Sequence, residues 1–185
     1  MVETATVTGE RQITETLQQM ASEMRQSDDA QSALRLAQIA EKVARNELNI
    51  AFCGHFSAGK STLVNAMVGR DLLASGPIPT SANVVYVRHG AGRACVKLKD
   101  GTAAEVPINE LGEHLRDADR VQEVHVSLPL SDWPHGVALL DTPGVDSTDD
   151  AHRIATESAL HLADVVLYVT DYNHVLSDVN FQFTK

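Results

Sequence analysis

Residues 54–61 form a complete phosphate-binding loop, and this segment constrains the fold more than any other part of the chain. They read Gly-His-Phe-Ser-Ala-Gly-Lys-Ser, which matches the pattern G-x-x-x-x-G-K-[ST]. An apolar run of strand length, residues 48–53, precedes the loop, and residues 62–68 read as the opening of a helix. This strand–loop–helix order is the context that the pattern requires, so the sequence predicts a nucleotide-binding α/β domain.

The residue types of the loop suit contact with phosphate. Glycines let the backbone turn tightly, so that successive N–H groups converge on phosphate oxygens, and the helix N-terminus adds partial positive charge there. In this pattern Lys60 reaches the β- and γ-phosphates and Ser61 ligates Mg²⁺. His55 could contact phosphate or a neighbouring subunit, although an ordinary surface position is the simpler interpretation. The predicted nucleotide-contacting residues of the loop are Gly54, His55, Phe56, Ser57, Ala58, Gly59, Lys60, Ser61 and Thr62.

A second motif follows about 80 residues after the loop. Asp141-Thr142-Pro143-Gly144 comes after a short apolar run at residues 137–140 and has the D-x-x-G arrangement of GTP-binding proteins. In such sheets this strand lies beside the loop strand, so Asp141 can hold a Mg²⁺-bound water and the Gly144 N–H can meet the γ-phosphate. The four residues alone would be a weak turn signal, and their spacing from a complete loop gives them weight.

A loop rich in proline and glycine, residues 72–81, lies between the two motifs. A GTPase needs a threonine here whose hydroxyl closes on Mg²⁺ when the γ-phosphate is present. Thr80 is our candidate, and Ser81 is the competitor. Val145 stands where some GTPases carry a water-orienting glutamine, so the attacking water must be positioned by another group, such as the Thr80 backbone or a partner.

Composition narrows the class of protein. The formal charge of the 185 residues is −10, which argues against a nucleic-acid-binding surface and against a polybasic membrane patch. Cys53 and Cys95 both fall in expected strands and suggest no disulfide framework, so a reducing compartment is expected. The start of the chain resembles no signal peptide, and no apolar run approaches the roughly 18 residues of a membrane span. We therefore expect a cytoplasmic protein.

The segment before the loop, residues 10–47, is helical in pattern. Ile13, Leu17, Met20 and Met24 recur at spacings of three and four, which predicts a stripe on one helix face. The pattern breaks at residues 27–29, and Asp28 with Gln31 predicts a capping box for a second helix. Two interpretations stay open: both helices pack on their own domain, or they belong to a helical bundle completed by later sequence.

The rest of the chain alternates between strand and helix patterns. The predicted fold is an α/β three-layer sandwich with a mixed, mainly parallel sheet and an N-terminal helical extension. The expected elements are strands at 83–87, 121–128 and 137–140, a hairpin over 94–106 turned at Asp100-Gly101, a short helix from a cap at Asn109 to Asp117, a helix near 150–161, a buried strand at 165–169 and a last helix from Ser177.

Four segments resemble the dynamin superfamily, most closely the bacterial dynamin-like proteins, with mitofusins as relatives. These segments are residues 54–62, 77–82, 141–144 and 169–174. The resemblance implies a dynamin-type GTPase domain over residues 48–185, preceded by bundle helices within residues 1–47. It implies GTP and GDP as ligands with Mg²⁺, and a homodimer or higher assembly through the nucleotide face. It also implies peripheral membrane association and remodelling of membranes, by fusion, fission or repair, through lipid-binding regions outside these residues.

The resemblance assigns roles to particular residues. It places Lys60 on phosphate, Ser61 and Thr80 on Mg²⁺, Asp141 in the water shell of the ion, and Ser57 where the loop organises compensation of charge. With Gly144 on the γ-phosphate, the catalytic set is Lys60, Thr80, Ser57 and Gly144.

Two departures from the family limit the carry-over. Phe56 stands where eukaryotic dynamins have a catalytic glutamine, so their hydrolysis geometry does not transfer whole. The guanine-reading [NT]-K-x-D element and two core strands are expected beyond Lys185, so we expect a domain truncated at its C-terminus. The alternatives are a regulatory or ribosome-assembly GTPase of the same fold, and a non-catalytic nucleotide-binding scaffold.

Overall fold

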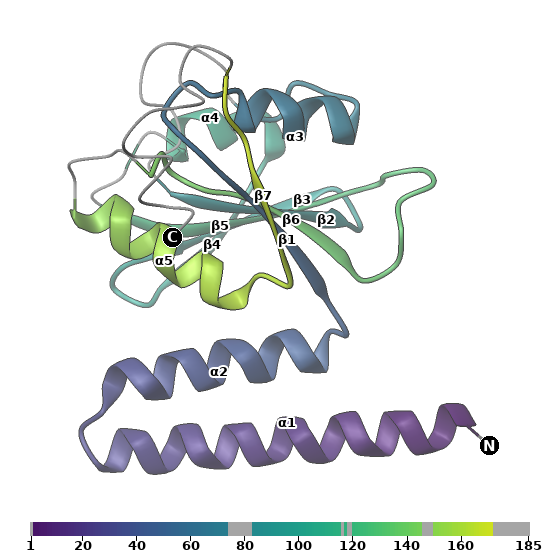
Figure 1. The fold of residues 1–185 in the computed structure, drawn as a ribbon, viewed down its shortest axis with the longest axis vertical. Helices are drawn as coiled ribbons and strands as arrows, with labels where there is room; N and C mark the ends of the chain where they lie inside the picture. Colours follow the sequence, from purple (N-terminus) through teal and green to yellow (C-terminus); the bar gives the residue numbers. More distant parts are fainter. Residues whose placement is uncertain (1, 74–82, 116, 118–119, 146–149, 172–185) are drawn as a thin grey trace. The chain divides into compact units, whose positions relative to one another are not determined.

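The computed structural model describes residues 2–73, 83–115, 117, 120–145 and 150–171 of the chain (Figure 1). The chain divides into two compact units, residues 1–48 and 49–185, and each is described here by itself. Within the described residues, no helix combines the length and the apolar character that a membrane crossing would need.

The first unit is a pair of helices, α1 (Val2–Gln26) and α2 (Ala30–Ala44), which pack along each other (Figure 1). Buried alanines at positions 21, 33 and 40 let the two backbones approach closely. In the predicted stripe, Leu17 and Met24 are half-buried, while Ile13 and Met20 are exposed. The helix pair therefore covers only part of its own apolar surface.

The predicted break between these helices is confirmed, but the predicted cap is wrong. Asp29, not Asp28, caps α2, because its side chain accepts a hydrogen bond of 3.0 Å from the Ser32 N–H. Asp28 has a φ of 63° and lies in the turn between α1 and α2. Asp28 therefore lies one residue before the point where a side chain can reach the first free N–H groups of the helix.

The second unit is built on a seven-stranded sheet of order β4-β3-β5-β2-β6-β1-β7. Parallel pairs join β1 to β7 and β2 to β5, and antiparallel pairs join β2 to β6, β3 to β4 and β3 to β5. The predicted α/β fold with a mixed sheet is thus confirmed, but three of these five pairs are antiparallel, so the expected predominance of parallel pairing does not hold among them. The strands are β1 (Leu48–Cys53), β2 (Val84–His89), β3 (Arg93–Leu98), β4 (Ala103–Val106), β5 (Val121–Leu128), β6 (Val137–Asp141) and β7 (Val165–Tyr168).

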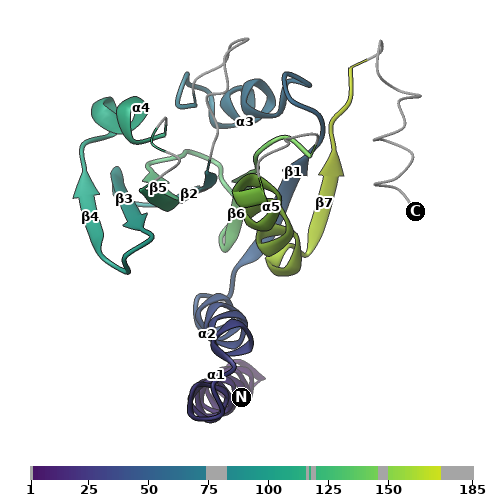
Figure 2. The same cartoon turned by 90° about the vertical axis from the view of Figure 1, so that its left-hand side faces the viewer.

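Helices cover both faces of this sheet and make the three layers (Figure 2). On one face lie α3 (Lys60–Val68), the 3₁₀ turn η1 (Ile108–Glu110) and α4 (Leu111–His114), and on the other lies α5 (Asp150–Leu162). Side chains of a strand alternate between the faces, so Val85 and Val87 join the apolar cluster under α3, while Val84 and Tyr86 join the cluster under α5.

The elements expected outside the two motifs are confirmed only in part. The hairpin turn at Asp100-Gly101 is confirmed, with the Asp100 carboxylate accepting from the N–H and hydroxyl of Thr102. The cap at Asn109 is wrong, since η1 begins at Ile108 after Pro107 and has no side-chain cap. The strand expected at 165–169 is confirmed as β7, but its burial is not, because β7 is the last strand in the order of the described residues and Val165, Val166 and Leu167 are 40%, 44% and 40% exposed. The helix expected from Ser177 lies outside the described residues.

Candidate nucleotide site

The two sequence motifs meet where β1 and β6 end, because these two strands are neighbours in the sheet. The phosphate loop leaves β1 after Cys53, and Asp141 is the last residue of β6. The loop requires glycine at Gly54, where φ is 149° and a Cβ would lie 2.0 Å from the main-chain oxygen of Val169. Gly59, with a φ of 97°, is the N-cap of α3, so the helix N-terminus faces the loop.

Lys60 folds its side chain back across the loop. Its Nζ donates hydrogen bonds to the main-chain oxygens of Gly54, at 3.0 Å, and of His55, at 2.8 Å. The side chain is buried, so these carbonyls compensate an ammonium group that is shielded from water. The ammonium is therefore already held at the concave side of the loop, where phosphate binds in this motif.

Ser61 and Asp141, which are far apart in the chain, are in direct contact. Ser61 Oγ donates a hydrogen bond of 2.7 Å to Asp141 Oδ2, and the carboxylate is fully buried. A hydroxyl and a carboxylate are oxygen donors of the kind that Mg²⁺ prefers, together with phosphate and water. Within the described ranges no group of three His, Cys, Asp or Glu side chains could hold a metal by itself. The residues therefore fit a Mg²⁺ that shares its ligands with a nucleotide.

The D-T-P-G segment is fastened to the loop strand. Thr142 Oγ1 donates to the Phe52 main-chain oxygen at 2.8 Å, and the Val145 N–H donates to the Gly54 oxygen at 3.2 Å. From the α5 side, Thr156 Oγ1 donates to the Pro143 oxygen at 3.4 Å. Sequence reasoning assigned no role to the two threonines, because nothing in the D-x-x-G pattern specifies the residue after the aspartate.

A second feature that the sequence did not reveal lies at the far end of α3. The buried carboxamide of Asn65 accepts from the N–H groups of Leu72 and Leu73, at 3.1 and 2.8 Å, and donates to the Leu73 oxygen at 2.7 Å. It thereby fixes the chain just before residues 74–82. Thr80 and its competitor Ser81 lie in that range, outside the described residues.

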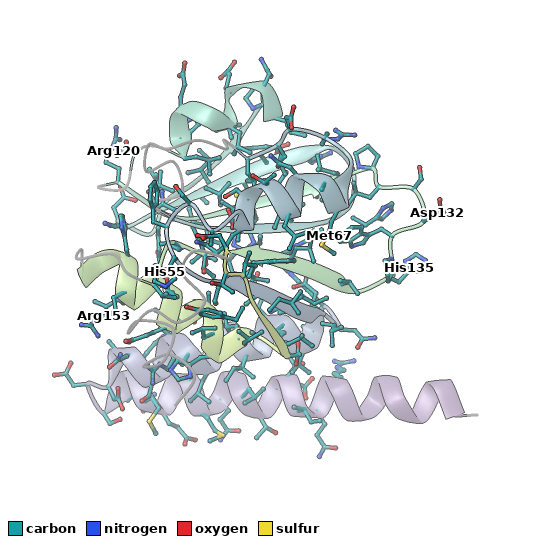
Figure 3. All side chains as sticks on the ribbon, turned by 45° about the horizontal axis from the view of Figure 1, so that its top comes forward. His55, Met67, Arg120, Asp132, His135 and Arg153 are labelled. Carbon is teal, nitrogen blue, oxygen red and sulfur yellow. The ribbon has the colours of Figure 1, made fainter. Side chains whose placement is uncertain are left out.

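The other loop residues differ in exposure. His55 is only 7% exposed, so the interpretation as an ordinary surface histidine is wrong, and Figure 3 shows it within the body of the unit while Arg120 and Arg153 project outward. Phe56 is 41% exposed and Ser57 is exposed at a φ of 59°, so both face outward.

Cys53, the last residue of β1, has a buried side chain at the base of the loop. Burial raises the pKa of the Cys53 thiol, although the Thr142 hydroxyl, whose Oγ1 lies 3.7 Å from Cys53 Sγ, acts in the opposite direction. The thiol therefore stays neutral at physiological pH, and it packs as a small apolar group rather than acting as a nucleophile.

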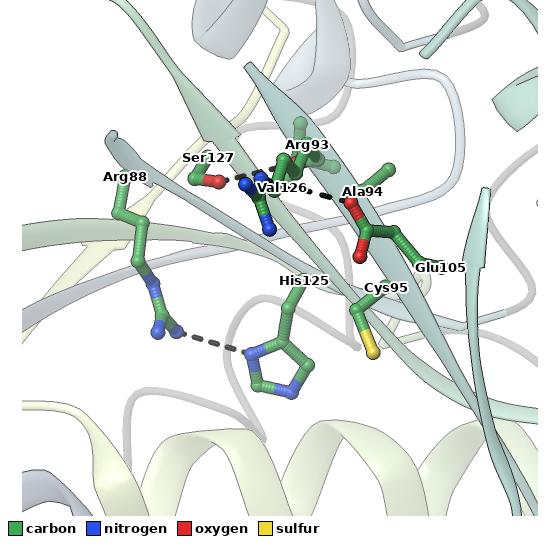
Figure 4. Close-up of a pocket in the computed structure, with 8 residues that line it drawn as sticks. All are labelled: Arg88, Arg93, Ala94, Cys95, Glu105, His125, Val126 and Ser127. Atoms are coloured by element: carbon green, nitrogen blue, oxygen red, sulfur yellow. Dashed lines mark hydrogen bonds and ion pairs between the residues drawn. The ribbon is translucent and has the colours of Figure 1, made fainter. Parts of the chain in front are cut away.

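A cavity of about 260 Å³ lies away from this site, on the sheet face formed by β2, β5, β3 and β4 (Figure 4). Arg88 at its wall pairs in register with Ala138 near the start of β6, whereas Asp141 ends that strand. An Arg88 guanidinium nitrogen lies 3.1 Å from His125 Nδ1, and His125 Nε2 lies 3.0 Å from Glu123 Oε1. Since arginine only donates, Nδ1 accepts and Nε2–H donates to the carboxylate.

Comparison with known proteins gives a consistent result. The family model described as "Dynamin family" matches residues 50–185. Dynamin-like protein A of Bacillus subtilis is 40% identical over 164 residues, which are 86% of this chain and 14% of that protein. Rat mitofusin-2 is 28% identical over 154 residues, 78% of this chain and 20% of that protein.

The fold also matches a solved structure of an oligomerised bacterial dynamin pair that senses and tethers membranes. The TM-score is 0.63 at 20% identity, over 100% of this chain and 36% of that one. The chain thus spans less than half the length of each of these relatives.

Proposed function

The chain belongs to the dynamin family, and from this premise we propose that it binds GTP with Mg²⁺ and hydrolyses the nucleotide to GDP and phosphate. The single observation that carries the proposal is the contact of Ser61 with Asp141 beside the Lys60 ammonium. It joins a hydroxyl, a carboxylate and a cation at the N-terminus of one helix, which is the set of groups that phosphoryl transfer to water requires.

The proposed roles follow from these positions. Lys60 exchanges its bonds with the loop carbonyls for bonds with the β- and γ-phosphate oxygens. The loop N–H groups and the α3 N-terminus bind the same phosphates. Ser61 would be a ligand of Mg²⁺, and Asp141 would hold a water of the ion, which when bound neutralises charge that develops on the phosphates. The Gly144 N–H would meet the γ-phosphate.

Two further residues complete the proposed catalytic set. Thr80 would close on Mg²⁺ from the segment that Asn65 anchors at its start. Ser57 would organise charge compensation at the outer turn of the loop, where it is exposed. The resemblance of their sequence neighbourhoods to the family supports both assignments.

We also propose self-association through the nucleotide face. Phe56 presents a large apolar ring beside the phosphate loop, where a neighbouring copy could cover it. The similar bacterial dynamins are described as an oligomerised pair, which supports the same proposal. A contact there would also bring groups from a second copy to a site in which Val145 replaces a water-orienting glutamine.

The N-terminal helix pair suits a helical bundle completed by further sequence. Ile13 and Met20 of α1 and Leu34 and Ile39 of α2 are exposed apolar side chains, which a third helix would bury. In this proposal the bundle couples the GTPase unit to membrane remodelling, with lipid contact outside these residues and peripheral attachment on the cytoplasmic side. No nucleic-acid partner is expected for a chain of charge −10.

Nucleotide binding by the full-length protein tests this function. GTP and ATP affinities are measured with Mg²⁺ for the wild type and for Lys60→Ala, with Lys99→Ala, an exposed lysine of the β3–β4 turn, as the matched control. We expect GTP-selective binding that is lost in Lys60→Ala and retained in Lys99→Ala. Equal affinity for GTP in all three proteins would contradict the proposal.

A further inference from the structure

Thr142 is a buried hydroxyl of the site and bonds the D-T-P-G segment to β1, the strand that leads into the phosphate loop. Its side chain is fully buried, and Oγ1 donates a hydrogen bond of 2.8 Å to the main-chain oxygen of Phe52. Phe52 is the second-last residue of β1, and Thr142 directly follows the last residue of β6. The bond therefore joins the ends of the two strands from which the phosphate loop and the D-T-P-G segment emerge.

The direction of the Phe52 carbonyl explains why a hydroxyl is needed here. The Cys53 oxygen accepts from the Val169 N–H at 2.7 Å, on the β7 side of β1. Successive carbonyls of a strand point to opposite sides, so the Phe52 oxygen points toward β6. The Thr142 hydroxyl, directly after the end of β6, supplies a donor to this carbonyl of the buried Phe52.

The two consecutive side chains of the motif thus hold different parts of the site. Asp141 receives the hydroxyl of Ser61, the second residue of α3, while Thr142 is bonded to β1. Pro143 follows with a restricted φ and is held through its oxygen by Thr156. The position of the Asp141 carboxylate relative to the loop is therefore fixed by its bond with Ser61 and by the bonds of the two residues that follow it.

We propose that Thr142 is a positioning residue for the magnesium–nucleotide complex. The inference rests on the proposed GTPase function, and it concerns a residue that would touch neither the nucleotide nor the ion. The hydroxyl of Thr142 sets the distance between the Asp141 carboxylate and the loop, and with it the fit of the Mg²⁺ water shell. Loss of the hydroxyl therefore affects the Mg²⁺ requirement of the reaction more than the binding of the nucleotide itself.

The test uses the full-length protein and three threonine variants. Thr142→Val keeps the shape and removes the hydroxyl, Thr142→Ser keeps the hydroxyl, and Thr16→Val is the matched control on α1, where the hydroxyl bonds to the Gln12 oxygen of its own helix. GTP turnover is measured against Mg²⁺ concentration. GTP affinity is measured separately in EDTA, and the melting temperature is recorded for each variant.

We expect the half-saturating Mg²⁺ concentration to rise about fivefold in Thr142→Val, the factor that corresponds to about one hydrogen bond. GTP affinity in EDTA should stay within about twofold, and Thr142→Ser and Thr16→Val should behave as the wild type. An unchanged Mg²⁺ requirement in folded Thr142→Val, or a lower melting temperature as its only change, would overturn the inference. If Thr142→Val does not fold, a raised Mg²⁺ requirement in Thr142→Ser would overturn it instead.

Failure of the inference can be told apart from failure of the function. Absence of GTP turnover in the wild type, or its persistence in Lys60→Ala, would refute the GTPase proposal itself. Lys60-dependent turnover with a Mg²⁺ requirement that Thr142→Val leaves unchanged would refute only the positioning role.

Discussion

Ser61 Oγ lies 2.7 Å from Asp141 Oδ2, although 80 residues separate the two in the chain. The contact exists because β1 and β6 are adjacent in the sheet. The loop after β1 therefore brings the start of α3 to the end of β6. The two oxygen groups are thus close enough to share the environment of one hard cation.

Replacement of the buried carboxylate tests its proposed place in the water shell. Asp141→Asn keeps the shape and an oxygen acceptor but removes the charge. We expect GTP turnover by the full-length protein to fall about 10- to 100-fold, the range for groups that orient metal ligands. Higher Mg²⁺ should restore part of the loss. Glu157→Gln on the exposed face of α5 serves as control, and turnover equal to that of the control would argue against a role for Asp141.

A side chain at Gly54 is expected to destabilise the fold by a steric clash, in addition to the backbone strain of its positive φ. In Gly54→Ala the added Cβ would meet the Val169 main-chain oxygen at 2.0 Å, so β1 and the chain after β7 would have to separate. We expect a loss of several kcal/mol in the free energy of unfolding.

The matched control for Gly54→Ala is Gly101→Ala. Gly101 has a φ of 85° with open space around it, so only strain of about 1 kcal/mol is expected. Urea unfolding measures both losses, and equal losses in the two variants would contradict the steric account.

The polar network on β3 and β5 predicts a pH-dependent stability. Burial acts to raise the pKa of Glu123, but His125 and the Lys97 ammonium, whose Nζ lies 2.8 Å from the carboxylate, outweigh it and lower the pKa to about 2. Because the pKa is lowered on folding, the ionised carboxylate stabilises the fold above its ordinary pKa of 4.5, and this is lost as pH falls toward about 2.

Glu123→Gln removes this contribution. We expect it to destabilise the unit by about 1–3 kcal/mol at pH 7 in urea unfolding, since the Glu123 side chain is only 12% exposed. The difference from the wild type should shrink by pH 3. Glu113→Gln on the exposed side of α4 gives the baseline. A difference that is constant between pH 7 and pH 3 would show that the charge of Glu123 is not what stabilises the sheet.

Substitutions of the neighbouring residues Asp29 and Asp28 should have different effects on the stability of the helix pair. Asp29→Ala removes the acceptor for the Ser32 N–H and should lower the helicity and the melting temperature of the helix pair. Asp28→Gly should leave both unchanged or raise them, because glycine adopts the φ of 63° at that position without strain. Circular dichroism of both variants decides, and a larger loss in Asp28→Gly would reverse the assignment of the cap.

The sequence indicated those residues of the candidate site that belong to a motif of fixed local spacing. Lys60, Ser61 and the loop glycines follow from a pattern of eight consecutive residues. Asp141 followed only because its motif ends a strand, and strands of this kind lie beside the loop strand. The mixed sheet was predicted from the alternation of strand and helix patterns, and the break between α1 and α2 from the interrupted helical pattern at residues 27–29.

Other features depend on contacts that no local pattern encodes. The burial of His55 and the exposure of β7 in the described part of the sheet depend on which segments pack around them. The bonds of Thr142 and Asn65 depend on free main-chain groups that exist only once the strands and α3 have packed. A one-residue error, as at Asp28, is the natural limit where two adjacent aspartates could each cap a helix.

Turnover of GTP by the full-length protein, measured beside Lys60→Ala with Mg²⁺ present, tests the central claim most directly. The account predicts GTP hydrolysis that exceeds ATP hydrolysis, that is abolished in Lys60→Ala, and whose rate per molecule rises with protein concentration. Hydrolysis of GTP at the same rate in Lys60→Ala and wild type would contradict it, because the loop built around that ammonium would then have no part in the reaction.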